Sequence, residues 1–344
     1  MNLTRGPALD RMRAADFLYP TEAGLYCPPG DFYIDPVRPV GRALITHGHG
    51  DHARAGHGAV LATRETLDIM AIRYGEDFTG QRQVADAPVT VGGVEVSFHP
   101  AGHILGSAQI RLAGPGPVVV VSGDYCRTPN PVCAPWEPVP CDIFVTEATF
   151  GLPVFRHPDP ASETRRLLAS MAEFPDRPHL IGAYALGKAQ RVIALLRQAG
   201  YDAPVHLHGA IQRLTDYHVA EGIALGELRP ATLEKTADKI AGQVVIAPPS
   251  AFESPWVQRF RDPVIAFASG WMTVRARARQ RGVELPLVIS DHVDWPQLTQ
   301  TLTELRPSEV WVTHGAEEGV LRWCALNQMQ ARPLRLVGYE DDAE

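Results

Sequence analysis

The feature that most constrains this sequence is a cluster of polar residues directly after a predicted buried strand at 42–46. His47-Gly48-His49-Gly50-Asp51-His52 places three imidazoles and a carboxylate within six residues. A loop leaving a strand end can direct alternate side chains at one point, as a metal site requires. Neutral imidazole and carboxylate suit zinc, manganese or iron, and the absence of thiolates leaves such an ion Lewis-acidic and open to water. The segment therefore predicts a metal site.

Further ligand-type residues occur just after other predicted strands. They are His103 after the strand ending near Phe98, Asp124 after 118–122, Glu147 after 143–146, His292 after 287–290 and His314 after 310–313. Loops at one edge of a sheet are where proteins commonly build sites. We therefore expect these residues and the 47–52 loop to share one edge of a sandwich of sheets.

The order of the predicted elements indicates one domain interrupted by another. Short β-branched runs predict strands at 42–46, 89–98, 118–122 and 143–146. Between 159 and 282, strands at 179–183, 205–207, 244–247 and 264–268 alternate with helices, one capped by Asp159-Pro160 and one ending at Gly200. Strands return at 287–290 and 309–313. We predict an α/β fold in which a parallel, Rossmann-like domain at 159–282 separates a first part, 1–158, from a second part, 283–344.

Composition and charge restrict the function classes. The chain has 344 residues, of which 45% are apolar and 21% charged, as in an ordinary globular protein. Its net charge of -7 argues against attachment to nucleic acid by bulk positive charge, although a local basic groove remains compatible with it. The five cysteines form no CxxC pair, so neither a disulfide framework nor a thiolate metal site is predicted. No apolar run approaches the roughly 18 residues of a membrane span, and we expect a cytoplasmic protein without membrane contact.

Two basic residues suggest phosphate binding. Lys188 and Arg191 lie in Gly187-Lys188-Ala189-Gln190-Arg191, which opens a predicted helix directly after a strand. Backbone amides at a helix start, together with two cations, can bind a phosphate group. The alternative is an ordinary solvated helix N-terminus.

Taken together, these residues resemble the metallo-β-lactamase superfamily, and the inserted α/β domain makes the sequence most similar to its β-CASP nucleases. The resemblance extends over nearly the whole chain. Segments 26–35 and 184–188 are most similar to a bacterial branch described as DNA-ligase-associated exonucleases, and also as mRNA 3′-end processing factor-like. This implies an αββα metallo-β-lactamase sandwich with an inserted β-CASP domain.

The resemblance also implies a role for individual residues. Two divalent transition-metal ions are implied, with zinc expected and manganese as the alternative. Their ligands would be His47, His49 and His103 for one ion, Asp51, His52 and His314 for the other, and Asp124 between them. Asp35 would orient the ligand loop from behind, unless it is an ordinary turn residue before Pro36. The catalytic residues would be Asp51, His292 as general acid and Glu147 as its partner.

The predicted function is a two-metal phosphodiesterase acting on nucleic acid. The branch resemblance favours a DNA exonuclease in repair that prefers single-stranded ends, leaves 5′-phosphate and 3′-hydroxyl, and works with a DNA ligase and a helicase. Histidine at position 314 instead resembles the RNA-acting members, so an RNA nuclease of the mRNA end-processing type is the first alternative. A small-molecule hydrolase of glyoxalase or lactamase type is a second, but it leaves the insertion unexplained.

Overall fold

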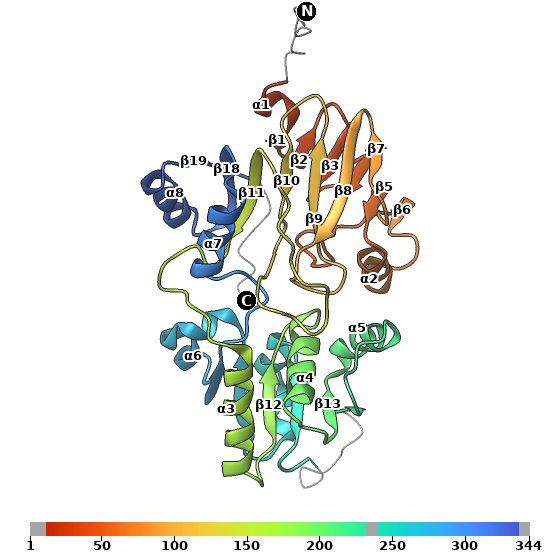
Figure 1. Ribbon diagram of the computed structural model, residues 1–344. Coiled ribbons are helices and arrows are strands. Elements are labelled where there is room, and N and C mark those ends of the chain that lie inside the picture. The colour runs from red at the N-terminus through yellow and green to blue at the C-terminus, as the bar shows by residue number, and fades with distance from the viewer. Residues whose placement is uncertain (1–11, 232–239, 337–344) are drawn as a thin grey trace, which may run out of the picture.

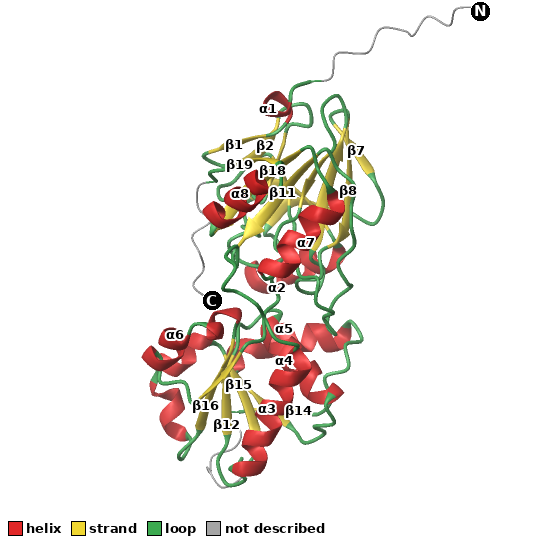
Figure 2. Cartoon of the chain, turned by 60° about the vertical axis from the view of Figure 1, so that its left-hand side comes forward, coloured by secondary structure: helices red, strands yellow, loops and turns green. Residues whose placement is uncertain are grey.

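The computed structural model describes residues 12–231 and 240–336, and the acidic end at 340–344 lies outside the described residues. The described residues form three β-sheets arranged in two lobes (Figure 1). The first lobe contains two sheets and their helices, and the second contains the third sheet and its helices. A view from another side shows the same two lobes, joined by loops at their facing ends (Figure 2).

The first lobe is a pair of sheets of six and seven strands. The first sheet has the order β1-β2-β3-β4-β5-β6, with strands Tyr19–Thr21, Gly24–Cys27, Phe32–Ile34, Arg42–Leu44, His57–Ala62 and Thr79–Val84. The second has the order β19-β18-β11-β10-β9-β8-β7, with strands Gln330–Pro333, Glu309–Gly315, Ile143–Ala148, Val119–Val121, Ala108–Ala113, Val94–Pro100 and Val89–Val91. A short helix, α1 (Ala14–Phe17), precedes them.

An apolar core lies between these two sheets. Ile34 of β3, Val96 of β8, Ile110 of β9 and Trp311 of β18 are all nearly inaccessible to solvent and belong to one cluster. Burial of such alternating strand residues is the main favourable contribution to folding here.

Helices cover the outer faces of both sheets. Leu67 and Met70 of α2 (Arg64–Tyr74) join Val60 of the first sheet in a second cluster. Helices α7 (Trp295–Leu305) and α8 (Glu317–Leu326) do the same on the second sheet, where Leu298 and Val320 share a cluster with residues of β10 and β11. The order helix, sheet, sheet, helix confirms the predicted sandwich.

The second lobe has a wholly parallel sheet with helices packed against it. Its order is β14-β13-β15-β12-β16-β17, with strands Leu228–Pro230, Val205–Leu207, Val244–Ala247, His179–Gly182, Val264–Ala268 and Leu285–Leu287. The helices are α3 (Pro160–Glu173), α4 (Lys188–Gln198), α5 (Gly209–Ala220), α6 (Arg275–Gln280) and the short η2 (Pro249–Glu253), η3 (Pro255–Arg259) and η4 (Gly270–Thr273). As expected from Asp159-Pro160, Asp159 caps α3, with its carboxylate accepting from the Ala161 amide at 3.1 Å.

Two strand predictions differ from the structure. The run 89–98 is two strands, because Gly92 and Gly93, at φ of 55° and 88°, make a hairpin turn between β7 and β8. The strand predicted at 287–290 is wrong: β17 ends at Leu287 and pairs with β16, so the third sheet extends beyond residue 282. Residues 288–294, here called the return loop, lead the chain back to the first lobe.

Among the helices of residues 12–231 and 240–336, none has the length and apolar character needed to span a bilayer.

Candidate metal centre

The loop at 47–52 follows β4 and is anchored by one buried carboxylate. Thr46 donates its backbone N–H to Asp35 Oδ1 at 2.8 Å and its hydroxyl to Asp35 Oδ2 at 2.6 Å. That hydroxyl lies 3.0 Å from His47 Nδ1, and Asp35 Oδ2 lies 2.8 Å from His52 Nδ1. Because the Thr46 hydroxyl and the carboxylate can accept from these Nδ1 atoms, the Nε2 atoms of His47 and His52 are the ones available as ligands.

A first group of ligand atoms comes from the 47–52 loop and two later loops. The donor atoms of His47, His49, His103 and Asp124 all lie within 4.8 Å of one another. Asp124 Oδ2 is 3.4 Å from His47 Nε2 and 3.7 Å from His103 Nε2. His103 Nε2 is in turn 3.0 Å from His49 Nδ1. The predicted ligands of one ion are therefore brought together.

The predicted ligands of the other ion surround the same carboxylate. His314 Nε2 lies 3.3 Å from Asp124 Oδ1, and His52 Nε2 lies 3.5 Å from Asp124 Oδ2. Asp51 Oδ2 is 3.4 Å from His52 Nε2. Asp124 thus contacts both groups, which is the arrangement that a bridging ligand requires.

The electrostatics of this cluster suit a bound cation. Burial, together with the nearby His52, lowers the pKa of His47 well below its ordinary value, so this imidazole is neutral. Burial would also lower the pKa of His52, but Asp51, Asp124 and Asp35 raise it to about 10. The carboxylates therefore favour positive charge at this place.

The available donor atoms fit a divalent ion. Burial and the nearby His292 lower the pKa of His103 to about 3. Burial by itself would raise the pKa of Asp51, but the nearby His52 outweighs it and lowers that pKa to about 2. Neutral imidazole and ionised carboxylate are the forms that bind metal. His47 Nε2 is fully buried and forms no hydrogen bond with any part of the chain that the structure describes. None of the potential metal-ligand groups among the described residues includes a cysteine.

Two predicted ligands of the first group are oriented by the return loop and by the second lobe. His103 Nδ1 donates to the carbonyl oxygen of Asp291, in the return loop, at 2.8 Å. His49 Nε2 lies 3.2 Å from the carbonyl oxygen of Leu186, just before α4. These bonds direct His103 Nε2 and His49 Nδ1 toward the cluster.

His292 and Glu147, 145 positions apart in sequence, form a buried pair. His292 Nδ1 lies 3.0 Å and 3.1 Å from the two carboxylate oxygens of Glu147, which also accepts from the Tyr125 amide at 2.9 Å. The donor atoms of Asp124, Glu147 and His292 all lie within 4.8 Å of one another. The predicted acid and its partner therefore lie beside Asp124, the predicted bridging carboxylate.

Lys188 and Arg191, which the sequence suggested as phosphate contacts, are fully buried. Lys188 Nζ forms an ion pair with Asp291 Oδ1 at 2.6 Å, and Arg191 Nη1 donates to the Ser290 carbonyl oxygen at 2.6 Å. Helix α4 begins inside the protein rather than in solvent. Both cations hold the return loop, and neither reaches a surface where a nucleic-acid strand could touch it.

Sequence reasoning missed Asp291. Its carboxylate binds Lys188, its carbonyl orients His103, and its donor atoms lie within 4.8 Å of those of His103 and His292. The sequence carried one signal, since 290–294 is a polar stretch next to His292 and between apolar segments. This polar stretch could have indicated a structural role for Asp291, the residue before the predicted general acid His292.

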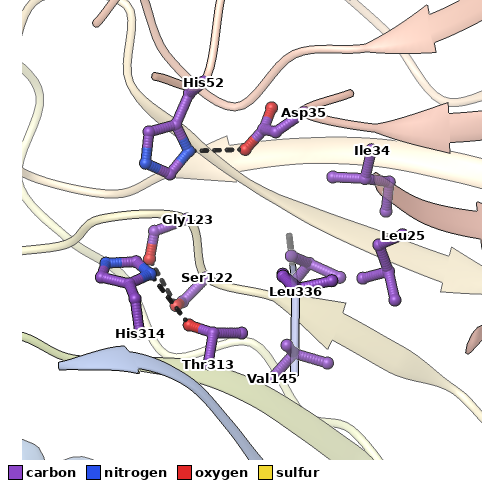
Figure 3. A pocket seen from close by; sticks show the side chains of 11 residues that line it. Leu25, Ile34, Asp35, His52, Ser122, Gly123, Val145, Thr313, His314 and Leu336 are labelled. Atoms are coloured by element: carbon purple, nitrogen blue, oxygen red, sulfur yellow. Dashed lines mark hydrogen bonds and ion pairs between the residues drawn. The ribbon is translucent and has the colours of Figure 1, made fainter. Parts of the chain in front are cut away.

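A small cavity lies behind the cluster, between the first two sheets. Figure 3 shows His52 and His314 at one end and Leu25 and Ile34 at the other. The centroids of the two imidazole rings are 6.0 Å apart. The apolar end continues the core, so it offers no further metal ligand.

Three relatives named for nucleic-acid enzymes resemble this chain, whereas no family model matches it. A protein of Opitutus terrae named "Probable DNA ligase" is 29% identical over 307 residues, which are 85% of this chain and 28% of that protein. "RNase aCSPSF2" of Saccharolobus solfataricus is 27% identical over 184 residues, 52% of this chain and 34% of that protein. "Ribonuclease TTHA0252" of Thermus thermophilus is 30% identical over 203 residues, 50% of this chain and 46% of that protein.

These relatives belong to the β-CASP group of the metallo-β-lactamase superfamily. The 47–52 motif and the sandwich with its second, parallel lobe match that group. This confirms the family expected from the sequence, including its DNA-ligase-associated branch. A solved structure, that of a protein of unknown function from Enterococcus faecalis V583, has the same fold, with a TM-score of 0.55 and 12% identity over 86% of this chain and 79% of that one. The chain spans less than half the length of each of the three relatives above.

Proposed function

We propose that this β-CASP protein is a two-metal phosphodiesterase that degrades DNA from its ends. The observation that carries the proposal is the His292–Glu147 pair within 4.8 Å of Asp124. A proton donor thus adjoins a cluster of imidazoles and carboxylates. This combination suits cleavage of a bond whose leaving oxygen needs a proton.

The metal ligands are proposed as two sets that share one residue. They are His47, His49 and His103 in the first set, Asp51, His52 and His314 in the second, and Asp124 in both. Two divalent transition-metal ions, zinc in the first instance or manganese, would supply an activated water and stabilise charge on the phosphoryl oxygens. Asp35 keeps the histidine tautomers that these ligands require.

His292 is proposed to protonate the leaving group. A carboxylate beside an imidazole favours its charged form, and the Glu147 oxygens accept from Nδ1–H, which leaves Nε2–H as the proton to be donated. Water attacks phosphorus, its hydroxyl stays there and its other proton passes to solvent, while the bond from phosphorus to O3′ breaks and O3′ takes the proton from Nε2. The products are a 5′-phosphate and a 3′-hydroxyl. No 2′-hydroxyl takes part.

DNA is proposed as the substrate, with single-stranded ends preferred, in a repair process shared with a DNA ligase and a helicase. Support comes from the Opitutus terrae protein, in which a segment similar to this chain lies within a longer protein named as a probable ligase. RNA is the second candidate, because two of the relatives above are named as ribonucleases. Histidine at position 314, which resembles the RNA-acting members of the family, also favours it.

The test is a comparison of end-labelled oligonucleotides of matched sequence, as single- and double-stranded DNA and RNA, with zinc or manganese supplied. We expect single-stranded DNA to be shortened fastest, to products that carry a 5′-phosphate. Asp124→Ala should abolish cleavage and lower the metal content per chain. Faster degradation of RNA under both metals would replace the DNA assignment by the RNA one, and no cleavage of any substrate by the metal-loaded protein would refute the nuclease proposal.

A further inference from the structure

The burial of Lys188 and Arg191 raises the question of which cations meet the phosphates of a substrate. Between Asp262 and Glu284 the sequence contains no acidic residue but four arginines. They are Arg275, Arg277, Arg279 and Arg281, here called the arginine cluster, and they lie on α6 and at its C-terminal end. Such a cluster is unusual in a chain whose net charge is -7.

The arginine cluster lacks neighbouring negative charge. Arg275, Arg279 and Arg281 are exposed, and Arg277 is partly buried. Within the described ranges, 12–231 and 240–336, none of the four forms an ion pair. Arg275 and Arg279 are four positions apart, as are Arg277 and Arg281, so like charges adjoin on the helix surface, which is unfavourable. An anion bound there would relieve this repulsion.

Aromatic contacts connect the arginine cluster to the proposed general acid. The Arg277 guanidinium lies over the Trp271 ring, 3.9 Å from its centroid. The Trp271 and Phe150 ring centroids are 5.0 Å apart, and those of Phe150 and His292 are 6.2 Å apart. Both ribbon views place α6 at the end of the second lobe that faces the first (Figures 1 and 2). Arg277 is therefore linked to His292 through two aromatic side chains, and the exposed arginines belong to the same short segment as Arg277.

We propose that the arginine cluster binds the phosphates of a single nucleic-acid strand whose reacting end lies at His292. This inference rests on the proposed function and names how that site holds its substrate. Arginine binds phosphate through two parallel hydrogen bonds, and its fork is preorganised for them. Arg277, stacked on Trp271, anchors α6, while the three exposed guanidinium groups face the strand. Contacts of this kind are independent of base sequence and weaken as salt rises.

The test compares two double variants that change the net charge equally. Arg275→Glu with Arg279→Glu removes half of the arginine cluster, and Arg213→Glu with Arg322→Glu changes two exposed arginines on α5 and α8. Binding of a fluorescent single-stranded oligonucleotide is measured by anisotropy at several salt concentrations, with chelator present to prevent cleavage. Each phosphate contact contributes about 0.7 to the salt slope for a single strand. We expect the first variant to bind about tenfold more weakly or worse, with a slope smaller by about 1.4, and the second to bind as the parent does.

Equal affinities of the two double variants, at equal melting temperatures, would overturn the inference. Hydrolysis of bis(p-nitrophenyl) phosphate tests the proposed phosphodiesterase activity separately from strand binding, because this diester is too small to reach α6 from the proposed metal centre. Its rate should be unchanged in the Arg275→Glu, Arg279→Glu variant. If the parent protein hydrolyses no diester but still binds the strand through Arg275 and Arg279, the nuclease proposal fails and the binding site stands.

Discussion

Asp35 controls two proposed metal ligands although it lies behind both. One carboxylate oxygen accepts from the Thr46 hydroxyl, which lies 3.0 Å from His47 Nδ1, and the same oxygen is 2.8 Å from His52 Nδ1. The residue also adopts a positive φ of 44°, a conformation that Asp tolerates better than most residues. Its carboxylate therefore holds Thr46 and His52 in place, and its backbone conformation is compatible with that position.

Replacing Asp35 by Asn should weaken metal binding while preserving the shape of the side chain. The amide supplies only one acceptor oxygen and no charge, so His47 and His52 lose their fixed tautomers. Loss of such a supporting group typically costs about 10- to 100-fold in metal affinity. Metal per chain after dialysis against a weak chelator would measure this, and Asp31→Asn, the same change at an exposed position, provides the control. Equal metal retention by the two variants would contradict the role given to Asp35.

His292→Ala should separate proton donation from metal binding. We expect the variant to keep the parent's metal content and to lose about 10²-fold or more in turnover, the usual contribution of a positioned general acid. Glu147→Gln should lower turnover less, because the amide still orients Nδ1 but does not support the charged imidazole. Metal content and initial rates, measured on the same samples, would show whether turnover is lost while metal is retained. A His292→Ala protein with full activity would remove the general acid from the mechanism.

At the scale of elements, α4 and the return loop form one unit. The first turn of α4 supplies Lys188 and Arg191, which bind Asp291 and the Ser290 carbonyl. Burial by itself raises the pKa of Asp291, but Lys188, His103 and His292 outweigh it and hold that pKa well below the ordinary value. The return loop is therefore kept in place by a buried ion pair rather than by a strand.

Lys188→Met should destabilise the protein, because it leaves the Asp291 carboxylate buried without its ammonium partner. Breaking a buried pair in this way costs about 3–5 kcal/mol in free energy of unfolding. Adding Asp291→Asn removes the orphaned charge, so the double variant should recover much of the loss. Urea unfolding of the parent, both single variants and the double variant yields the coupling energy. Strictly additive losses would show that the two residues do not act as a pair.

The sequence predicted the elements whose signals are local, and it missed those that depend on packing. Asp159-Pro160 marked the start of α3, and the ligand-type residues at 47–52, 103, 124 and 314 were found because each follows an apolar run. The run ending at Leu287 gave no sign of which sheet it would join, since strand pairing is a long-range choice. A Lys and an Arg on a first helical turn are also expected from sequence to be exposed to solvent. Their burial follows from tertiary contacts with residues 290 and 291.

At the scale of the whole molecule, we expect buried histidines outside the proposed metal centre to contribute to the response of stability to acid. Burial lowers the pKa of His57, His179 and His218. In the unfolded chain these imidazoles titrate near pH 6.5, so below that pH the unfolded state takes up protons that the folded state excludes. Stability should therefore be fully present above about pH 6.5 and should fall as the pH decreases below it.

Replacing His179 and His218 by Asn should flatten this pH dependence. Each titrating histidine contributes at most about 1.4 kcal/mol per pH unit in the affected range. The free energy of unfolding, measured in urea at pH 7.5 and 5.5 on chelator-treated protein, should fall less in the double variant than in the parent. An identical fall in both proteins would assign the acid sensitivity to other groups.

The hydrogen bonds from His49 and His103 to carbonyl oxygens at Leu186 and Asp291 make the proposed metal centre depend on the second lobe and the return loop as well as on the first lobe. Moving α4 and the return loop together away from the first lobe would break both bonds and leave two predicted ligand imidazoles free to rotate, so such an open form would bind metal less tightly. Thermodynamic reciprocity then requires that metal binding favour the closed arrangement by the same free energy. Metal supply would thus set how readily the two lobes part to admit or release a polymer, as well as the rate of the chemical step.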